Sequence, residues 1–420
     1  MNKFYKKYIR IPPNESIDIR KIGGIIHHPL FQRLLHISQL GTALMVFPGA
    51  KHTRFEHALG VYGKTLRFSE KMVKDGFLTP KEGWNVSLFA LLHDIGHGPF
   101  SHVIEELTPE SGDEDENGLV VLKRFKKEII KSGGDYKLIT DIFKHKNPLY
   151  KIVMDKNVGM DKLDYLERDT YHTGFGQRPD VESIFNYLVY LKGNLVIDKK
   201  SLEAAKQMQK LYLYMYKEVY LHKSSLICQR FLQKMISKVI GLDNLDASSL
   251  WMMNDTELVS RVLCSTDKQL LFLYNCYKDR NLPRVGLVVR LKNKEFKERI
   301  AGKKIKVIGE DRNFFNQFLK LTSPQSLASI EAKIAKLIKI DEHKVIIVPT
   351  VTPWRFVPED ILYHDDGQIL SLKSTHKDYF VSMKAEMDDY MAVRVCIIGD
   401  RKVIYKNSSG IYRILKKEIE

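Results

Sequence analysis

The segment LLHDIGHGPFSH at residues 91–102 carries three histidines and one aspartate. It completes the run WNVSLFALLHDI at 84–95, whose apolar character is typical of a buried helix. The glycine and proline residues at 96–99 predict that this helix ends there. Because His93 and Asp94 are adjacent, their side chains diverge around a helix, and both reach one ion only near a helix end. The glycines after Asp94 predict such an end.

Further histidines and carboxylates that precede residue 170 supply additional candidate ligands. His57 lies in KHTRFEHALGV, and Asp161 lies in GMDKLDYLERD. A divalent metal that keeps open positions for water and substrate needs neutral imidazoles and carboxylates from different elements. Three predicted helices can supply that set, which consists of His57, His93, Asp94 and Asp161.

A second His-Asp dipeptide, His364-Asp365, offers a comparison within the same chain. It lies in YHDDGQ, which is typical of a turn. Isolated dipeptides of this kind are common and usually form a cap or a surface pair, so we assign it no role.

Four polar residues of the segment 161–169 share one helical face. At ~100° per residue, Asp161, Lys162, Tyr165 and Asp169 fall within ~100° of arc. A candidate metal ligand, a cation, a phenol and a carboxylate then point to the same side of a helix. The alternative is a solvated charged face with Tyr165 half-buried, since charge runs on helices are usually exposed.

The 420-residue chain has a globular composition and is strongly basic. Hydrophobic residues make up 44% and charged residues 28%, which excludes a disordered or collagen-like chain. The net charge of +16 favours an anionic partner, a class that includes nucleotides, nucleic acid and acidic surfaces. The basic stretch LKNKEFKERIAGKKIK at 291–306 either follows a nucleic-acid backbone or forms an ordinary solvated surface.

Cysteine usage and hydropathy indicate a soluble intracellular protein. The four cysteines form no C-x-x-C pair, so reduced thiols are expected. The basic N-terminus has no apolar segment behind it that would make a signal peptide. No apolar run approaches the ~18 residues of a membrane span. We therefore expect a cytoplasmic protein without a membrane partner.

Hydrophobic periodicity predicts a mainly α fold with a smaller α+β C-terminal region. Helices are expected at 28–75, 84–95, 119–131, 161–172, 181–192 and 201–240, and a loop is expected at 108–118. Short β-branched runs predict strands at 343–351, 393–400 and 402–406, with an amphipathic helix at 325–339. The predicted domains are a helical core at 1–240, a helical extension at 241–300 and an α+β domain at 301–420.

The pattern H…HD…D resembles the signature of the HD superfamily of metal-dependent phosphohydrolases, which implies an HD-type helical core. Three longer strings, QLGTALMVFPGAKHTRFEHALGV, HDIGHGPFSH and MDKLDYLERD, resemble the deoxynucleoside-triphosphate triphosphohydrolases. That branch includes the bacterial dGTPases and the human protein that combines a sterile-alpha-motif with an HD domain. The resemblance extends over about residues 18–235 and implies hydrolysis of dNTPs to deoxynucleoside and inorganic triphosphate.

The resemblance implies roles for individual residues. By matching position, the ligands of a divalent ion (Mn, Fe, Mg or Zn) are His57, His93, Asp94 and Asp161. The residues that contact the phosphates or the sugar are Gln39, Leu40, Arg54, His102, Lys162, Tyr165 and Asp169. Among these, Gln39 and Leu40 match the pair that reads the 3′-hydroxyl and crowds the 2′ position. His97 matches a catalytic histidine near the phosphates.

The sequence departs from the family at the proposed general acid. A His-Glu pair of the family aligns with Asp115-Glu116, inside the predicted acidic loop. A carboxyl group donates a proton only if its pKa is raised. The base-stacking tyrosine of the family aligns near Lys206, and the candidates to replace it are Tyr212, Tyr214 and Tyr216.

Three functions therefore stay open. The first is dNTP triphosphohydrolysis by a homo-oligomer, with an allosteric nucleotide held at a subunit interface by the basic stretch 291–306. The second is an HD-type phosphodiesterase or nuclease that acts on nucleic acid. The third is a catalytically weak nucleotide sensor that has lost the His-Glu pair.

Overall fold

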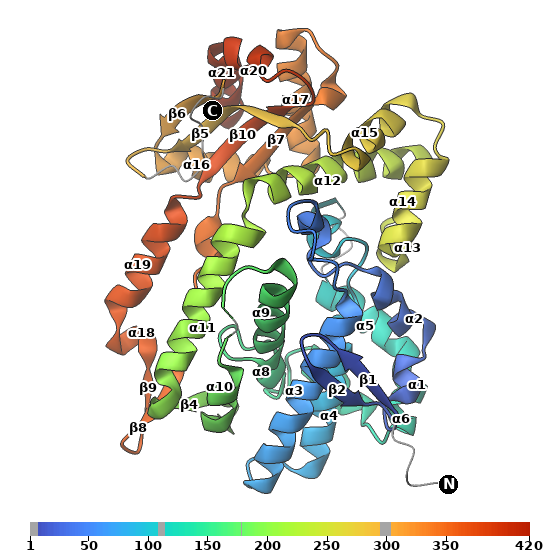
Figure 1. Ribbon diagram of the computed structural model, residues 1–420, viewed down its shortest axis with the longest axis vertical. Helices are drawn as coiled ribbons and strands as arrows, with labels where there is room; N and C mark the ends of the chain where they lie inside the picture. Colours follow the sequence, from blue (N-terminus) through green and yellow to red (C-terminus); the bar gives the residue numbers. More distant parts are fainter. Residues whose placement is uncertain (1–6, 108–113, 178, 295–303) are drawn as a thin grey trace. The chain divides into compact units, whose positions relative to one another are not determined.

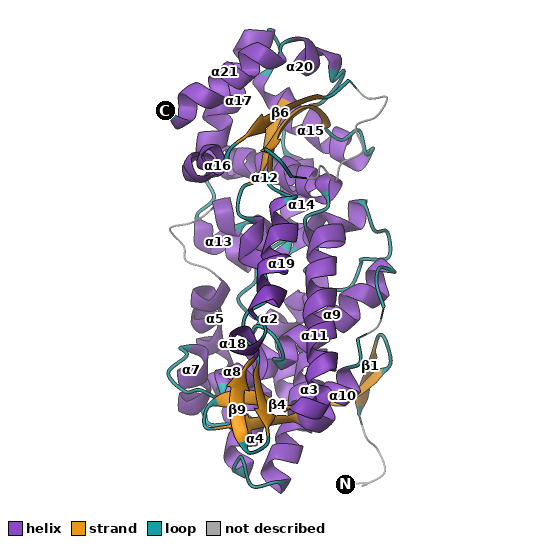
Figure 2. Ribbon diagram, turned by 90° about the vertical axis from the view of Figure 1, so that its left-hand side faces the viewer, coloured by secondary structure: helices purple, strands orange, loops and turns teal. Residues whose placement is uncertain are grey.

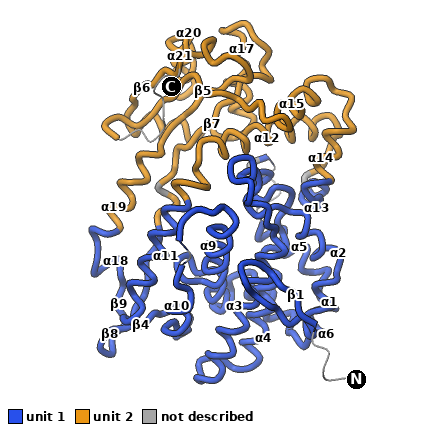
Figure 3. Tube along the Cα trace, in the orientation of Figure 1, with its two compact units in different colours: residues 1–215, 247–256, 358–379 blue, residues 216–246, 257–357, 380–420 orange. Residues whose placement is uncertain are grey.

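The computed structural model describes residues 7–107, 114–177, 179–294 and 304–420 (Figure 1). The chain forms two compact units (Figure 3). Unit 1 comprises residues 1–215, 247–256 and 358–379, and unit 2 comprises residues 216–246, 257–357 and 380–420. Helices dominate both units (Figure 2), so the predicted mainly α fold with a smaller α+β C-terminal region is confirmed.

Unit 1 holds most of the helices that precede residue 215. They are α1 (Gly23–Ile26), α2 (Pro29–Gln32), α3 (Arg54–Lys74), α4 (Pro80–Leu92), α5 (Glu114–Leu122), α6 (Lys126–Lys131), α7 (Tyr136–Phe143), α8 (Tyr150–Met154), α9 (Met160–Thr173), α10 (Val181–Tyr187) and α11 (Leu202–Met215). Later segments add α13 (Ala247–Met252) and α18 (Leu372–Thr375). Its strands are β1 (Tyr8–Ile11), β2 (Glu15–Asp18), β3 (Leu188–Leu191), β4 (Asn194–Asp198), β8 (Leu362–Asp365) and β9 (Gln368–Ser371).

The helices α3 and α4 pack along each other and carry the HD segment. Thr79 and Glu82 form a capping box at the start of α4, and Pro80 occupies its first turn. The last turns of α4 are buried on all sides, which explains their uninterrupted apolar sequence. α3 also packs on α9. A Cβ atom at Gly60 would lie 2.1 Å from Arg168 Nη2 and 2.1 Å from Asp164 Oδ1, so glycine permits this close approach.

The helical segment predicted at 28–75 is interrupted in its middle. After α2, the chain forms 3₁₀ turns at Arg33–His36 and Gly41–Met45, and α3 begins only at Arg54. Gly41 has a φ of +51°, a conformation that favours glycine and interrupts a helix. These turns separate α2 from α3, the helix that carries the first candidate ligand, His57.

The predicted helix at 181–192 is also wrong in its second half. Residues 188–191 form β3, which pairs with β4 through a turn at Lys192-Gly193, where both φ values are positive. Such two-residue hairpins need positive φ at both positions. The four-stranded sheet then continues in the order β3-β4-β8-β9, with β4 and β8 parallel and the other pairs antiparallel.

Other local predictions have mixed outcomes. The helix at 161–172 is confirmed as α9. The predicted loop at 108–118 is wrong from residue 114 onward, where α5 begins, and residues 108–113 lie outside the described ranges. The predicted helix at 119–131 is divided by a 3₁₀ turn at Lys123–Phe125.

Unit 2 contains the α+β region. Its helices are α12 (Lys223–Asp243), most of α14 (Asp255–Cys264), α15 (Lys268–Lys278), α16 (Arg312–Phe318), α17 (Pro324–Ile338), most of α19 (Lys377–Asp388), α20 (Lys402–Lys406) and α21 (Ser408–Ile419). A π-helical turn at Tyr216–Tyr220 precedes α12 and interrupts the predicted helix at 201–240. Its strands are β5 (Arg284–Leu291), β6 (Lys306–Glu310), β7 (Val345–Thr350) and β10 (Ala392–Ile397).

The sheet of unit 2 has the strand order β6-β5-β10-β7. β10 is antiparallel to both neighbours, while β5 and β6 are parallel. Alternate residues of β5, β7 and β10 join α16, α17, α20 and α21 in one apolar core. The predicted strands at 343–351 and 393–400 and the predicted helix at 325–339 are confirmed.

The strand predicted at 402–406 is wrong, because these residues form α20. The Asp400 carboxylate accepts a hydrogen bond from Lys402 N at 3.0 Å, and Ile404 is fully buried next to Gly286 of β5. Tertiary burial therefore overrides the β-branched composition of this segment. The predicted domain ranges stay a prediction, and the compact units run across them, since β5 lies within 241–300 and pairs with β6 and β10.

Membrane insertion has no candidate segment in the described part of the chain. None of its helices is at once long enough and apolar enough to cross a bilayer.

Candidate metal centre and active site

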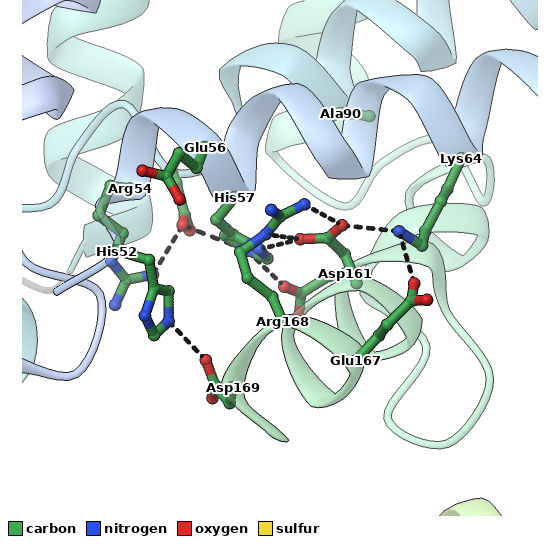
Figure 4. Close-up of polar contacts among 12 residues, drawn as sticks. His52, Arg54, Glu56, His57, Lys64, Ala90, Asp161, Glu167, Arg168 and Asp169 are labelled. Carbon is green, nitrogen blue, oxygen red and sulfur yellow. Dashed lines mark hydrogen bonds and ion pairs between the residues drawn. The ribbon is translucent and has the colours of Figure 1, made fainter. Parts of the chain in front are cut away.

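Three of the predicted ligands converge on one point. Ligand atoms of His57, His93 and Asp161 all lie within 4.8 Å of one another. His57 comes from the first turn of α3, His93 caps the C-terminus of α4, and Asp161 lies in the first turn of α9. His57 Nε2 is 3.0 Å from Asp161 Oδ1, and His93 Nε2 is 3.6 Å from the same oxygen. Figure 4 shows His57 and Asp161 facing each other from two helices.

The fourth predicted ligand lies at the same place. Asp94 Oδ1 is 3.3 Å from His93 Nε2, and Asp94 Oδ2 is 3.5 Å from His57 Nε2. The adjacent residues His93 and Asp94 reach one centre because α4 ends at Leu92, immediately before them. The structure thus brings all four predicted ligands together.

Hydrogen bonds orient both imidazoles toward the centre. His93 Nδ1–H donates to the Ala90 carbonyl oxygen at 2.7 Å, and His57 Nδ1 is 2.8 Å from Asp164 Oδ2. These contacts direct each Nε2 lone pair inward, as in metal-binding histidines. His93 Nε2 is buried and has no hydrogen-bond partner among the described residues, so this donor set fits a divalent ion.

The electrostatics of the cluster also favour a cation. Burial opposes protonation of His57, but hydrogen bonds with Asp161 and Asp164 raise its pKa to about 10. Burial likewise opposes ionisation of Asp94, yet Arg54 and His93 hold the pKa of this carboxyl well below its usual range. The carboxylates of Asp94, Asp161 and Asp164 thus favour positive charge at His57.

A buried ionic network contacts His57 through Asp164. Asp164 is fully buried and accepts hydrogen bonds from Arg168 Nε at 3.0 Å and Arg168 Nη2 at 2.9 Å. Lys64 Nζ donates to Asp164 Oδ1 at 2.8 Å. The same nitrogen lies 3.2 Å from Glu167 Oε2 (Figure 4). Sequence reasoning missed Asp164, although its spacing of four residues from Arg168 predicts a helical ion pair.

Arg54 is held rigidly beside the cluster. Its Nη1 donates to Asp94 Oδ2 at 2.6 Å, its Nε donates to Ser101 Oγ at 2.9 Å, and its Nη2 is 3.5 Å from His102 Nε2. Ser101 Oγ in turn donates to the Ser38 carbonyl oxygen at 2.7 Å. A cation in this fixed position can bind a phosphate oxygen with little loss of entropy.

The chain around Ser38 and Ser101 is anchored by Asp255, which sequence reasoning also missed. The Asp255 carboxylate accepts hydrogen bonds from Ser38 Oγ at 2.6 Å, Ser38 N at 3.0 Å and Phe100 N at 2.6 Å. Phe100 and Ser101 both have a φ of +56°, an unusual conformation for residues other than glycine. Because Asp255 lies more than 150 residues from Phe100, no local signal could have identified it.

A second histidine group lies next to the first. Ligand atoms of His97, His102 and Glu105 lie within 4.8 Å of one another. His97 Nε2 is 3.3 Å from Asp94 Oδ1, and His102 Nδ1 is 2.6 Å from Glu105 Oε1. Burial and the nearby Arg54 guanidinium lower the pKa of His97 to about 4, which keeps its imidazole neutral. Glu105 was missed, although it lies three residues after His102.

The predicted acidic residues Asp115 and Glu116 lie in the first turn of α5, with Asp115 half-buried and Glu116 exposed. The preceding residue, Glu114, interacts with Glu105 and His102. Burial and the Glu105 carboxylate raise the pKa of Glu114 to about 7. A carboxyl with this pKa can donate a proton near neutral pH.

The predicted substrate residues of α9 have distinct surroundings. Lys162 is buried, and its Nζ lies 3.5 Å from the centre of the Tyr212 ring. Burial lowers the pKa of Lys162 to about 8. Asp169 Oδ1 is 2.8 Å from His52 Nε2, and both side chains are buried. Tyr165 is half-buried on the same helix.

The remaining predicted contacts lie in the 3₁₀ region and in α11. Gln39 is buried, its Oε1 has no hydrogen-bond partner among the described residues, and the neighbouring Leu40 is half-buried. Tyr214 stacks on Phe175 with ring centres 5.4 Å apart. Tyr216 belongs to unit 2 and stacks there on Phe356.

Comparisons with known proteins agree with this geometry. The family model described as "HD domain" matches residues 54–168, and the model described as "HD associated region" matches residues 180–312. The first match contains all four predicted ligands. Residues 54–168 therefore form an HD domain, and the chain resembles the HD superfamily of phosphohydrolases.

Two relatives show which proteins with an HD domain this chain resembles. An uncharacterized protein of Methanocaldococcus jannaschii is 36% identical over 244 residues, which cover 56% of this chain and 50% of that protein. The deoxynucleoside triphosphate triphosphohydrolase SAMHD1 homolog of Dictyostelium discoideum is 31% identical over 220 residues, which cover 46% of this chain and 40% of that protein. Within the superfamily, the chain thus resembles the deoxynucleoside triphosphate triphosphohydrolase branch, and it spans about half the length of these curated relatives or less.

A solved structure resembles the whole chain. The crystal structure of a phosphohydrolase from Bacteroides thetaiotaomicron has a TM-score of 0.70 and 25% sequence identity. The match covers 94% of this chain and 100% of that one. The resemblance therefore includes the α+β region as well as the HD domain.

Proposed function

We propose that this protein is a metal-dependent phosphohydrolase that converts dNTPs to deoxynucleoside and inorganic triphosphate. The observation that carries the proposal is the convergence of His57, His93 and Asp161 within 4.8 Å, with Asp94 in contact with both imidazoles. The triphosphohydrolase named among the relatives supports the choice of substrate.

These four residues hold the ion in the proposed enzyme. A divalent ion bound there would polarise a phosphoryl oxygen and lower the pKa of a bound water molecule. The second imidazole nitrogens of His57 and His93 keep their hydrogen bonds to Asp164 and Ala90 throughout. This arrangement leaves the open side of the cluster to substrate, next to Arg54.

Cationic and neutral donors around the cluster bind the triphosphate. Arg54 contacts a phosphate oxygen through the guanidinium edge that faces His102, while its other edge stays on Asp94. Lys162 supplies a second positive charge below pH 8, because its pKa is about 8. Neutral His97 adds an N–H donor without repelling Arg54.

Proton transfer to the departing 5′ oxygen belongs to the group formed by His102, Glu105 and Glu114. Glu105 holds His102 Nδ1, so His102 Nε2 faces Arg54 and the phosphates. Glu114 supplies a carboxyl that is protonated below about pH 7. These contacts support Glu114 in preference to Asp115 and Glu116 as the acid of this segment.

Recognition of the sugar rests on the family resemblance. In this proposal Gln39 binds the 3′-hydroxyl, Leu40 crowds the 2′ position, and Tyr165 and Asp169 line the triphosphate and sugar. The unpaired Oε1 of Gln39 is consistent with a donor on the ligand. The proposed enzyme therefore prefers deoxyribose to ribose.

The direct test incubates the purified protein with each dNTP and each NTP in the presence of Mn²⁺, Mg²⁺, Fe²⁺ or Zn²⁺. Chromatography should reveal free deoxynucleoside and triphosphate from dNTPs, with little product from NTPs. Absence of turnover while elemental analysis shows a stoichiometric metal would contradict the proposal. Tight dNTP binding without product would identify a sensor, and cleavage of single-stranded DNA or RNA would identify a nuclease.

Assembly and allosteric control are part of the same proposal. The basic stretch 291–306 was predicted to hold nucleic acid or an allosteric nucleotide, but its residues 295–303 lie outside the described ranges. The net charge of +16 supports an anionic ligand of this kind. Light scattering with and without dNTP tests it, and a mass that does not respond to nucleotide counts against it.

A further inference from the structure

A pocket of about 770 Å³ lies in unit 1, away from the residues of the metal cluster. Its walls are the chain after β2 at 18–21, one face of α3 between residues 62 and 74, and the start of α4 at 80–84. β1 and β2 both pack on α3. The volume falls within the range of small-molecule sites, roughly 300–1,000 Å³.

The pocket and the metal cluster occupy opposite faces of α3. At ~100° per residue, Tyr62, Leu66 and Val73 point roughly 140–180° away from His57. Lys64, which belongs to the network behind His57, also points away from the pocket side. A ligand in this pocket therefore does not reach the metal-binding side chains, and the site is separate from the proposed active site.

Trp84 presents a fixed aromatic wall. Its Nε1–H donates to the Ser132 carbonyl oxygen at 3.0 Å, which holds the ring in place. Lys21 Nζ lies 5.1 Å from the centre of the ring, at cation–π distance. Leu66 and Val73 of α3 provide apolar wall on the same pocket. A flat, apolar body fits such a surface.

The charges of the lining favour one negative charge on the ligand. Arg20 and Asp18 neutralise each other, since Arg20 Nε donates to both carboxylate oxygens at 2.9 Å. The other charged lining residues are Lys21, Lys74 and Glu70, which leaves one positive charge in excess. A monoanion compensates this excess, whereas a cation would be repelled.

We propose that this pocket binds a small monoanion with a flat aromatic body, such as an aromatic sulfonate or carboxylate. The ring packs on Trp84 and on the apolar side chains of α3. The acidic group pairs with Lys21 and Lys74. The proposal is independent of the hydrolase activity, because it concerns another face of α3.

The test uses naphthalene-2-sulfonate as the probe and ¹⁹F NMR of protein that carries 5-fluorotryptophan. The chain has three tryptophans, and the Trp84→Phe variant identifies the signal of Trp84. Addition of the probe should shift the Trp84 signal in a saturable manner. Naphthalene-2-sulfonamide, which lacks the charge, and cyclohexanesulfonate, which lacks the aromatic ring, should each bind about tenfold more weakly.

Variants test the aromatic contact and the charge contact separately. Isothermal titration calorimetry measures the affinity of the variants, including those that lack the Trp84 signal. Trp84→Leu should weaken probe binding about tenfold, and the double variant Lys21→Gln, Lys74→Gln should do the same and reduce its salt dependence. The control Lys127→Gln changes an exposed lysine that does not line the pocket and should have no effect. If Trp84→Leu does not fold, the lysine variants and the two analogues still test the proposal.

Several results would overturn the proposal. These are equal affinity for the neutral sulfonamide, equal affinity for cyclohexanesulfonate, an unchanged affinity of the double lysine variant, or a response confined to Trp251 or Trp354. The measurements need no nucleotide and no turnover. A failure here therefore leaves the proposed hydrolase function untouched, and the reverse also holds.

Discussion

Two neighbouring groups in unit 1 use the same residue types for different tasks. The first group contains His57, His93 and Asp161, and the second contains His97, His102 and Glu105. In the first group, each imidazole has its Nδ1 bound to an oxygen outside the cluster, which leaves Nε2 directed inward. In the second group, His102 Nδ1 is hydrogen-bonded to the Glu105 carboxylate, which is a member of the group.

The difference decides what each group can bind. The inward lone pairs and ionised carboxylates of the first group suit a metal ion. The second group already contains an internal hydrogen bond between His102 and Glu105, and the Arg54 guanidinium lies 3.5 Å from His102. The Glu105 carboxylate is therefore already paired, and His102 Nε2 faces a guanidinium that attracts a phosphate. The role of each histidine therefore depends on the group that binds its Nδ1 nitrogen. The residue type alone does not determine it.

The largest expected effect is that of Asp94→Ala. Removal of one ligand from the first group should abolish metal binding and lower dNTP hydrolysis at least ~10³-fold. Elemental analysis and product chromatography measure both quantities. The matched control is Asp365→Ala in the other His-Asp dipeptide, whose carboxylate pairs with Lys199 on the surface of β8 and should be dispensable. Stoichiometric metal in Asp94→Ala would refute the ligand set.

The next largest effect is expected from Asp164, which binds His57 of the first group. Asp164→Asn keeps the shape but weakens the hydrogen bond that orients His57, and metal affinity should fall about 10–100-fold. Competition with a chelator measures the affinity. Glu167→Gln is the matched control, because Glu167 contacts Lys64 and should not alter the orientation of His57. Equal losses of metal affinity in the two variants would show that the network affects the metal site only through its charge.

The second group should respond differently. Glu105→Gln removes the anion that holds His102, and we expect dNTP hydrolysis to fall about 10²-fold while the metal content stays unchanged. The pH dependence of kcat should also change, since the proton donor is altered. Loss of metal in this variant would contradict the comparison, because it would assign Glu105 to the metal site.

The smallest effect is a pH dependence of substrate binding. Burial lowers the pKa of Lys162 to about 8, so its positive charge is present below pH 8 and is lost above it. At pH 9 roughly a tenth of the side chains stay charged, and KM for dNTP should rise up to tenfold between pH 7 and pH 9. Lys162→Arg keeps the charge and should flatten this rise. A rise of the same size in the arginine variant would exclude Lys162 as its cause.

Features that depend on local spacing could be predicted from the sequence. The end of α4 after an apolar run predicted that His93 and Asp94 lie at a helix terminus, and the structure has them there. The face formed by Asp161, Lys162 and Asp169 follows from helical periodicity within α9. Local periodicity failed at residues 188–191 and 402–406, where pairing and burial outweigh intrinsic preference.

The side chains that support the cluster depend on packing between distant segments. Asp164 meets His57 because Gly60 lets α3 approach α9 closely, and Asp255 reaches Ser38 and Phe100 from a segment far along the chain. A short sequence window reports the face of a helix on which a residue lies. It does not report which other element packs on that face, because this depends on the shape and burial of distant residues.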